Sequence, residues 1–213
     1  MPKATNREIE IKLRVRDLES LLRRIRDLGA TYKGRLFEQN SIYDTPDSDF
    51  RRSGRLLRVR LETSAPRRRA NIRGGRLSRP QRRSLRAVLT SKAPPHPGGR
   101  QAARLRFKER LERELTIRNP GPWPRVLRSL GLHPSFTYEK FRSTFELRGL
   151  QLDLDETPVG TFLELEGSPG TIDHAARALG FTQQDYFRGT YWDVYAADCR
   201  RRGRPIRNMV FPS

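Results

Sequence analysis

Apolar and charged residues alternate strictly near the start of the chain, where residues 8–13 read Glu-Ile-Glu-Ile-Lys-Leu. A period of two is typical of a β-strand whose two faces have different surroundings. The apolar face, formed by Ile9, Ile11, Leu13 and Val15, is ordinary, whereas the opposite face carries two carboxylates and an ammonium. A strand half exposed to water would explain one such pattern, so its recurrence along the chain is what makes it informative.

The alternation recurs with other charges. Two arginines alternate with three aliphatic residues at 57–61, and basic or acidic pairs follow at 108/110, 112/114, 140/142, 153/155 and 164/166. Altogether the pattern predicts eight strands, at residues 8–15, 32–43, 54–62, 87–92, 105–117, 136–147, 149–155 and 160–166. Helical spacing of apolar residues after Asp17, a suitable N-cap, predicts a helix that ends at Gly29. Similar signals predict helices at 122–130 and 171–179, and an aromatic-rich cap at 185–197.

Eight strands with short connections favour an α+β fold, an eight-stranded antiparallel closed barrel with helices packed outside it. If the helices cover the apolar faces, the charged faces must line the interior. Buried charges are costly unless they are paired or bind a metal. A ligand that needs both signs removes this cost, because a polyphosphate suits Lys and Arg while a divalent cation suits Asp and Glu.

Short motifs resemble the CYTH superfamily, also called triphosphate tunnel metalloenzymes, over about residues 5–197. The matching blocks, in order, are Glu8-x-Glu10-x-Lys12, Tyr43-Asp44-Thr45-Pro46, Arg58-x-Arg60, Leu89-Thr90-Ser91-Lys92, Lys108-x-Arg110-x-Glu112-x-Glu114, Tyr138-Glu139-Lys140-Phe141-Arg142, Leu154-Asp155-Glu156-Thr157-Pro158-Val159-Gly160, Phe162-x-Glu164-x-Glu166 and Thr190-Tyr191. The superfamily contains class IV adenylate cyclases and thiamine triphosphatases. Three positions differ from the residues that are frequent in the superfamily: Arg7 stands in place of His, Phe145 in place of Tyr and Thr190 in place of Ser. None of these differences removes a charge from the predicted interior.

The resemblance and the charge pattern together nominate the site residues. The residues expected to grip phosphate oxygens are Lys12, Arg58, Arg60, Lys92, Lys108, Arg110, Lys140 and Arg142. The residues expected to bind Mg²⁺ or Mn²⁺ are Glu8, Glu10, Glu112, Glu114, Asp155, Glu164 and Glu166. Glu8, Glu10 and Lys12 are the catalytic candidates. For any one of these residues the alternative is an ion pair on a strand face.

The resemblance implies a metal-dependent enzyme that acts on a triphosphate. The blocks at 138–142 and 154–166 are most similar to bacterial class IV adenylate cyclases, which convert ATP to cyclic AMP and pyrophosphate. The alternative is a triphosphatase that hydrolyses thiamine triphosphate, a nucleoside triphosphate or inorganic tripolyphosphate.

The chain carries 44 Lys and Arg against 24 Asp and Glu, a net charge of +20. Residues 63–108 alone contain 14 Lys and Arg and no acid. We therefore expect one domain at 1–199, an Arg-rich disordered insertion loop at 64–86, and a basic, disordered C-terminal tail at 200–213. The rival hypothesis is a nucleic-acid-binding module that uses this loop and tail. The loop lacks aromatic residues for base stacking, which argues against nucleic acid as a partner.

The single cysteine, Cys199, excludes an internal disulfide framework and is typical of a reducing cytoplasm. The sequence shows no secretory leader and no stretch that approaches a membrane span, so we expect a cytoplasmic protein without a membrane partner. A homodimer is compatible with the sequence.

Overall fold

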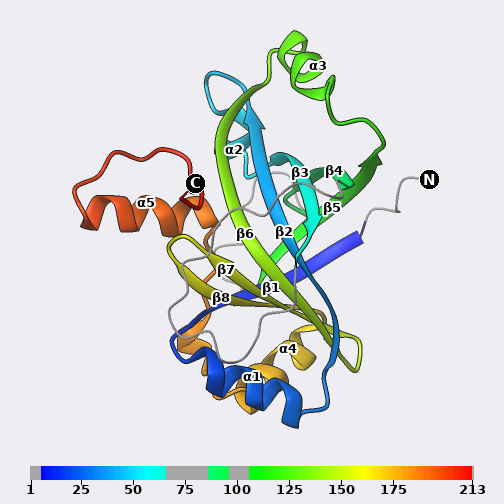
Figure 1. Ribbon diagram of the computed structural model, residues 1–213, viewed down its shortest axis with the longest axis vertical. Coiled ribbons are helices and arrows are strands. Elements are labelled where there is room, and N and C mark those ends of the chain that lie inside the picture. The colour runs from blue at the N-terminus through cyan, green and yellow to red at the C-terminus, as the bar shows by residue number, and fades with distance from the viewer. Residues whose placement is uncertain (1–5, 66–85, 96–105, 213) are drawn as a thin grey trace.

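The computed structural model describes residues 6–65, 86–95 and 106–212. Its strands close into one antiparallel barrel in the order β1-β5-β4-β3-β2-β6-β7-β8 (Figure 1). The strands are β1 (Asn6–Val15), β2 (Thr31–Asp44), β3 (Leu56–Ser64), β4 (Arg86–Ala93), β5 (Lys108–Ile117), β6 (His133–Leu147), β7 (Leu150–Thr157) and β8 (Gly160–Glu166). The predicted α+β barrel is thereby confirmed.

Helices follow the capping signals of the sequence. They are α1 (Leu18–Asp27), α2 (Asp49–Arg52), α3 (Trp123–Ser129), α4 (Pro169–Ala178), the 3₁₀ helix η2 (Gln183–Asp185) and α5 (Tyr191–Arg201). Asp17 caps α1 by accepting a hydrogen bond from the Ser20 amide. α4 begins two residues before the predicted start, because Ser168 provides the N-cap and Pro169 suits the first turn.

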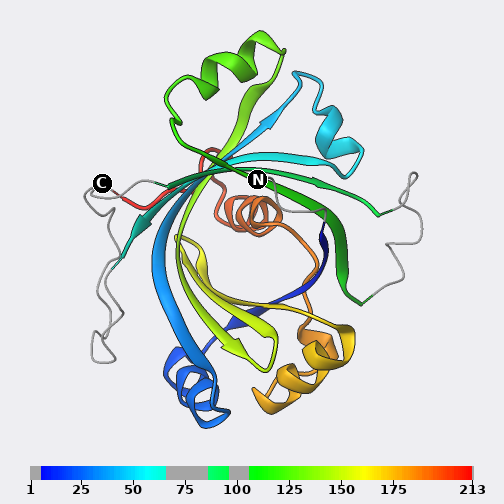
Figure 2. The same ribbon diagram turned by 90° about the vertical axis from the view of Figure 1, so that its right-hand side faces the viewer.

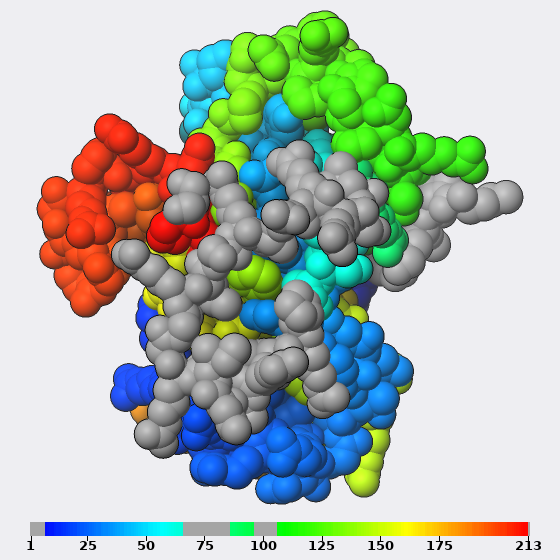
Figure 3. All heavy atoms as spheres, in the orientation of Figure 1, coloured from blue at the N-terminus to red at the C-terminus, as the bar shows by residue number. Residues whose placement is uncertain are grey.

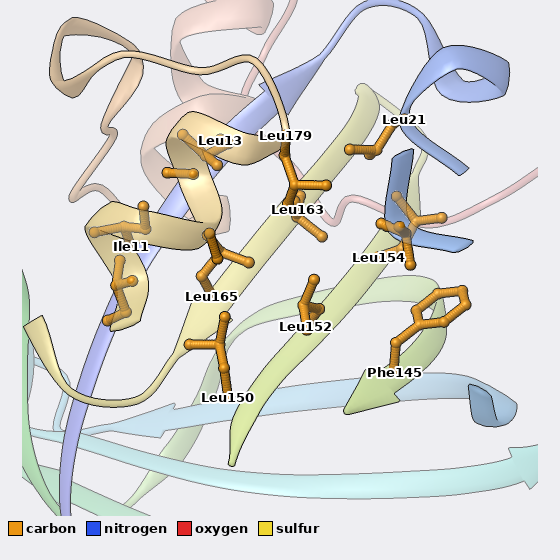
Figure 4. Packing of buried hydrophobic residues seen from close by; sticks show 14 residues of the cluster. Ile11, Leu13, Leu21, Phe145, Leu150, Leu152, Leu154, Leu163, Leu165 and Leu179 are labelled. Carbon is orange, nitrogen blue, oxygen red and sulfur yellow. The ribbon is translucent and has the colours of Figure 1, made fainter. Parts of the chain in front are cut away.

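The main hydrophobic core lies outside the barrel, between the strands and two helices. Leu13 of β1 and Leu163 of β8 face each other across the sheet and are fully buried. They pack with Leu21 of α1 and Ile172 of α4, and Figure 4 shows the leucines of β1, β7 and β8 converging on this layer. α1 and α4 lie side by side against the same part of the barrel (Figure 2).

This packing fixes which way the charged residues point. Successive side chains of a strand alternate between its two faces, so burying Ile11 and Leu13 under the helices turns Glu10 and Lys12 toward the interior. Glu10 is 9% exposed and Lys12 is 4% exposed. The usual polarity of a small barrel is therefore reversed, as the sequence pattern predicts.

The C-terminal segment is part of the fold, so the prediction of a disordered tail is wrong for it. The Met209 amide donates to the Thr137 carbonyl and the Glu139 amide donates to the Met209 carbonyl, both at 2.9 Å. These bonds cover an edge of β6 beyond its pairing with β7, which begins at Phe141. Phe211 packs against Phe141, and Figure 3 shows the red C-terminal residues next to α5.

Met209→Ala should therefore lower the free energy of unfolding by about 2 kcal/mol or more, because the side chain is 1% exposed and its removal leaves a cavity. Chemical denaturation of the variant measures the change. Ile206→Ala, in the same segment but 40% exposed, is the matched control and should lie within about 0.5 kcal/mol of the wild type. Equal, small effects of both substitutions would contradict the placement of the tail.

The predicted Arg-rich loop at 64–86 falls almost entirely on residues outside those described. Among the helices described, none is long and apolar enough to span a membrane.

Candidate functional site

The interior of the barrel holds a cavity of about 760 Å³. Its wall includes every sequence-predicted site residue except Asp155, namely Glu8, Glu10, Lys12, Arg58, Arg60, Lys92, Lys108, Arg110, Glu112, Glu114, Lys140, Arg142, Glu164 and Glu166. Cross-strand register brings these side chains together: Lys12 lies opposite Glu164, and Lys92 lies opposite Glu112. Residues far apart in the sequence thus form one surface inside the barrel.

One part of the wall is rich in cations. Arg58 of β3 is 8% exposed, and its guanidinium donates to the Thr90 hydroxyl at 3.2 Å and to the Tyr138 hydroxyl at 3.4 Å. The Arg58 Nε is buried and has no hydrogen-bond partner among the residues the structure describes. Although burial opposes its charge, Tyr138 and Glu38 raise the pKa of Arg58. This part of the wall can therefore accept an anion.

Lys140 and Arg142 of β6 extend this cationic surface. The Lys140 Nζ lies 2.8 Å from an Asp155 oxygen and 3.5 Å from a Glu38 oxygen. The Arg142 guanidinium contacts Asp155 through two nitrogens, at 2.7 and 2.6 Å, and also reaches Glu164. Burial favours a neutral Glu38, but Lys140 and Arg142 together hold its pKa well below the usual range. The carboxylates of Glu38 and Asp155, which lie behind the cavity wall, thus neutralise the charges of Lys140 and Arg142.

Another part of the wall is rich in carboxylates. The Lys92 Nζ lies 2.6 Å from both Glu8 oxygens and 3.2 Å from Glu112 Oε2. Burial raises the pKa of Glu8 despite the nearby Lys92. Burial and the charge of Glu8 raise the pKa of Glu166 to about 7, with a further contribution from Glu112. The carboxylates here repel one another, and so the site favours additional positive charge.

Glu10 and Lys12 lie between these two parts of the wall. Glu10 forms an ion pair with Lys108, with 2.7 Å between Oε1 and Nζ, and Lys12 forms one with Glu164, with 2.5 Å between Nζ and Oε1. Burial alone would raise the pKa of Glu10, but Lys108 and Lys12 lower it to about 2. Glu10 is therefore an anion at neutral pH, although its side chain is enclosed.

Asp155 is the exception among the predicted residues. It is fully buried, and its oxygens are held by Lys140, Arg142 and the Tyr191 hydroxyl, which donates at 2.6 Å. Tyr191, at the start of α5, lines the cavity in front of it. The structure therefore places Asp155 behind the wall, where it orients the two basic side chains.

Sequence reasoning did not select several interior residues. Glu38, Glu62 and Asp153 point inward, where Arg60 contacts Glu62 at 2.8 Å and Arg142 contacts Asp153 at 2.8 Å. The signal for Glu38 and Asp153 was present, because each shares the inward parity of its strand. The contribution of Tyr191 depends on how α5 packs, which no local pattern reveals.

Aromatic residues line the mouth of the cavity. Phe50 of α2, Phe136 of β6 and Trp192 of α5 are all part of its wall. The Arg51 guanidinium lies 3.5 Å from the ring centroid of Trp192 and so joins α2 to α5 across this region. Figure 2 shows α5 end-on across the centre of the ring of strands. The mouth thus offers flat, partly apolar surfaces next to the charged interior.

The fold and the site define a class of protein, a closed β-barrel whose interior is lined by paired charges of both signs. A family model described as the CYTH domain matches residues 6–189, and the chain belongs to this family. No curated protein matches the chain significantly.

Solved structures of low sequence identity share the fold. The PH1819 protein from Pyrococcus horikoshii is 20% identical with a TM-score of 0.67, covering 90% of this chain and 99% of its own. A protein from Vibrio parahaemolyticus, described as a proposed adenylate cyclase, is 16% identical with a TM-score of 0.63, covering 91% and 99%. A protein from Hippeastrum, described as a proposed adenylyl cyclase with a dominant triphosphatase activity, is 19% identical with a TM-score of 0.50, covering 93% and 97%.

Membership of this family implies a divalent metal cofactor, and the donor set fits one. Carboxylate oxygens are the ligands that hard divalent cations prefer. Within residues 6–65, 86–95 and 106–212, no three acidic, His or Cys side chains form a ready metal cluster, and lysines hold the carboxylates instead. Glu8 and Glu112, however, already converge from two strands on one cation, the ammonium of Lys92. A divalent cation would find suitable oxygens there and on Glu10 and Glu166.

Proposed function

We propose that this protein is a metal-dependent enzyme that acts on a nucleoside triphosphate held in the barrel. The observation that carries the proposal is the convergence of eight predicted basic residues in one cavity that also presents carboxylates. A chain of phosphates needs several cations along its length, and the divalent cation that accompanies it needs oxygen ligands. Both requirements are met within the same enclosed space.

The basic residues divide between positioning and charge stabilisation. Arg58 presents a buried Nε that has no hydrogen-bond partner in the described part of the chain, and Arg142 is fixed by its carboxylate partners. Both are therefore suited to hold phosphate oxygens in a defined geometry. Glu10 stays ionised and can hold the cation with Glu8 and Glu112. The bound cation would neutralise charge on the transferring phosphoryl group. Pre-oriented groups of this kind supply much of the catalysis in phosphoryl transfer.

The mouth of the cavity favours an organic triphosphate. Phe50 and Trp192 are partly exposed and provide aromatic surface on which a base can stack, and Arg51 provides a cation over Trp192. Inorganic tripolyphosphate would leave this surface unused.

Of the two reactions, we put cyclisation of ATP first. The ribose 3′-hydroxyl would attack the α-phosphorus, its proton would leave to a base, and pyrophosphate would depart with the electron pair of the broken bond. The motif resemblance of residues 138–142 and 154–166 to class IV cyclases supports this reaction, as does the description of the Vibrio relative. Hydrolysis is the second candidate, supported by the triphosphatase activity named for the Hippeastrum protein.

Product analysis separates the candidates. The protein is incubated with ATP, thiamine triphosphate or tripolyphosphate, each with Mg²⁺ or Mn²⁺, and the products are identified by chromatography. Cyclic AMP with pyrophosphate is the expected result, and orthophosphate would assign a triphosphatase. No turnover of any substrate would refute the proposal that the protein is an enzyme.

We place the activity in the cytoplasm, consistent with the free, buried Cys199.

Replacing residues 66–85 with a Gly/Ser linker tests the nucleic-acid hypothesis. Because the cavity wall is built from other residues, the enzyme proposal expects turnover to be retained within about twofold. Loss of turnover together with loss of RNA or DNA binding would favour the rival module.

Arg58→Ala should raise KM for the triphosphate by about 10- to 100-fold, the range expected when a charge-assisted contact is lost. Steady-state kinetics measure the change, and kcat should fall less than kcat/KM. Arg23→Ala, on an exposed position of α1, is the control for loss of an arginine. Unchanged saturation in Arg58→Ala would remove Arg58 from the phosphate site.

A further inference from the structure

Four lysines line the cavity and each is held by carboxylates, but their surroundings differ. Lys140 is 1% exposed and is held by Glu38 and Asp155, which lie behind the wall. The Lys12 partner Glu164 is also held by Arg142, so Glu164 keeps a cation if Lys12 moves away. Among residues 6–65, 86–95 and 106–212, the Lys108 Nζ contacts one carboxylate, that of Glu10. The Lys92 Nζ is shared by two carboxylates from different strands, Glu8 of β1 and Glu112 of β5.

Because Lys92 is shared by Glu8 and Glu112, a metal ion would compete with it for the carboxylates, and a phosphate would compete with the carboxylates for its ammonium group. A divalent cation needs the same Glu8 and Glu112 oxygens that now surround the ammonium, because two cations cannot share them at these distances. A phosphate needs the same ammonium protons that the two carboxylates now accept. Each ligand therefore has to break the same set of contacts, which span 2.6 to 3.2 Å.

Breaking these contacts with one ligand alone is costly. A cation bound by Glu8 and Glu112 displaces Lys92, whose side chain is only 13% exposed, and leaves a poorly solvated charge. A phosphate bound to Lys92 leaves the two carboxylates facing each other without a counter-charge. When both ligands bind, each charge regains a partner. The four-carbon stem of lysine permits the required swing from one partner to the other.

We propose that Lys92 is an internal counter-ion that couples metal binding to triphosphate binding. In the free protein Lys92 occupies the place of the cation, and when the cation arrives the ammonium turns to the phosphates. The inference rests on the proposed function and adds a positioning residue to it. It also implies that the metal and the triphosphate raise each other's binding affinity by the same factor. The charged interior thereby stays neutralised in the free and the loaded states.

The test compares Lys92→Met with the wild type by calorimetry. Titrations use Mn²⁺ alone, a non-cleavable ATP with methylene groups in both bridges alone, and each ligand in the presence of the other. Lys92→Met should bind Mn²⁺ alone about tenfold more tightly than the wild type, because its competitor for the Glu8 and Glu112 oxygens is gone. The same variant should bind the analogue alone more weakly and show a smaller coupling factor. Direct bonds between manganese and phosphate occur in both proteins and cancel in the comparison.

The direction of the change in Mn²⁺ affinity in Lys92→Met distinguishes the proposal from a merely structural role of Lys92. A lysine that only supports the site would leave Mn²⁺ affinity unchanged or lower when it is lost, and either result overturns the inference. Lys33→Met is the matched control, because Lys33 pairs with Glu146 at 2.7 Å on the surface, where both side chains are about half exposed. Its Mn²⁺ affinity should equal that of the wild type. If the analogue binds the wild type under no condition, the proposed function fails instead.

A second measurement uses the unmutated protein, so it does not depend on how the variant folds. An amine-reactive reagent labels lysines at rates that follow their accessibility and freedom, and mass spectrometry quantifies each site. Mn²⁺ alone should increase labelling of Lys92 severalfold relative to Lys33, and adding the analogue should reverse the increase. Labelling of Lys92 that does not respond to Mn²⁺ would overturn the proposal.

Discussion

Replacement of Glu10 by Gln should lower metal-dependent turnover on the order of 10²- to 10³-fold, the range seen when one preorganised electrostatic group is removed from an active site. Glu10 is enclosed yet ionised, because Lys108 and Lys12 hold its pKa at about 2. Glutamine has nearly the same shape but no charge, so it can neither balance these lysines nor bind a divalent cation strongly. The change is measured as kcat with saturating triphosphate and metal.

The folded state of Glu10→Gln should survive, which separates a chemical role from a structural one. The barrel wall is closed by backbone pairing of β1 with β5 and β8, and this pairing does not involve the carboxylate. Circular dichroism should match that of the wild type. Glu19→Gln, at an exposed position of α1, removes the same charge outside the barrel and should retain full turnover. Near-wild-type kcat in Glu10→Gln would remove it from the site.

Lys140→Met should lower the free energy of unfolding by about 3–5 kcal/mol, the cost of leaving buried charges without their partner. Lys140 is 1% exposed and contacts Glu38 and Asp155, which are equally enclosed. Methionine fills most of the volume, so the loss reflects charge more than packing. Urea denaturation at neutral pH measures it, with Lys33→Met as a surface control expected to change stability by less than about 1 kcal/mol.

The same variant makes a prediction about pH. Glu38 has a lowered pKa in the folded protein, with Lys140 the first of the charges that oppose the effect of burial. A lowered carboxyl pKa stabilises the fold above the unfolded value and loses that contribution as the pH falls. The difference in stability between the wild type and Lys140→Met should therefore be greatest at neutral pH and should shrink below the ordinary Glu pKa of 4.5. A difference that stays constant from pH 7 to 3 would assign the loss to packing.

The barrel and the identity of most cavity residues could be predicted because they depend on local alternation. In β1, Ile11 and Leu13 must face the helices, and this alone sends Glu10 and Lys12 inward. The same parity argument holds for Arg58 in β3. The charges themselves marked the interior as a site, since a barrel without a ligand would have no reason to hold them there.

The rest depends on contacts that no short stretch of sequence specifies. Asp155 has the inward parity of a ligand, yet Tyr191 of α5 covers it and makes it a support for Lys140 and Arg142. The C-terminal segment reads as basic and disordered, but two apolar residues, Met209 and Phe211, anchor it on β6. Composition describes the average of a segment, whereas a few side chains decide whether it packs.

The pairing of β1 also has a consequence for biosynthesis. Of the described strands of the barrel β1 is translated first, but its neighbours are β5 and β8, and β8 is the last of these strands to leave the ribosome. Until then Lys12 lacks Glu164, the residue that lies opposite it on β8. Distant pairings of this kind are slow to form. The tunnel therefore cannot close before β8 has been synthesised, when the first strand of the barrel can pair with the last.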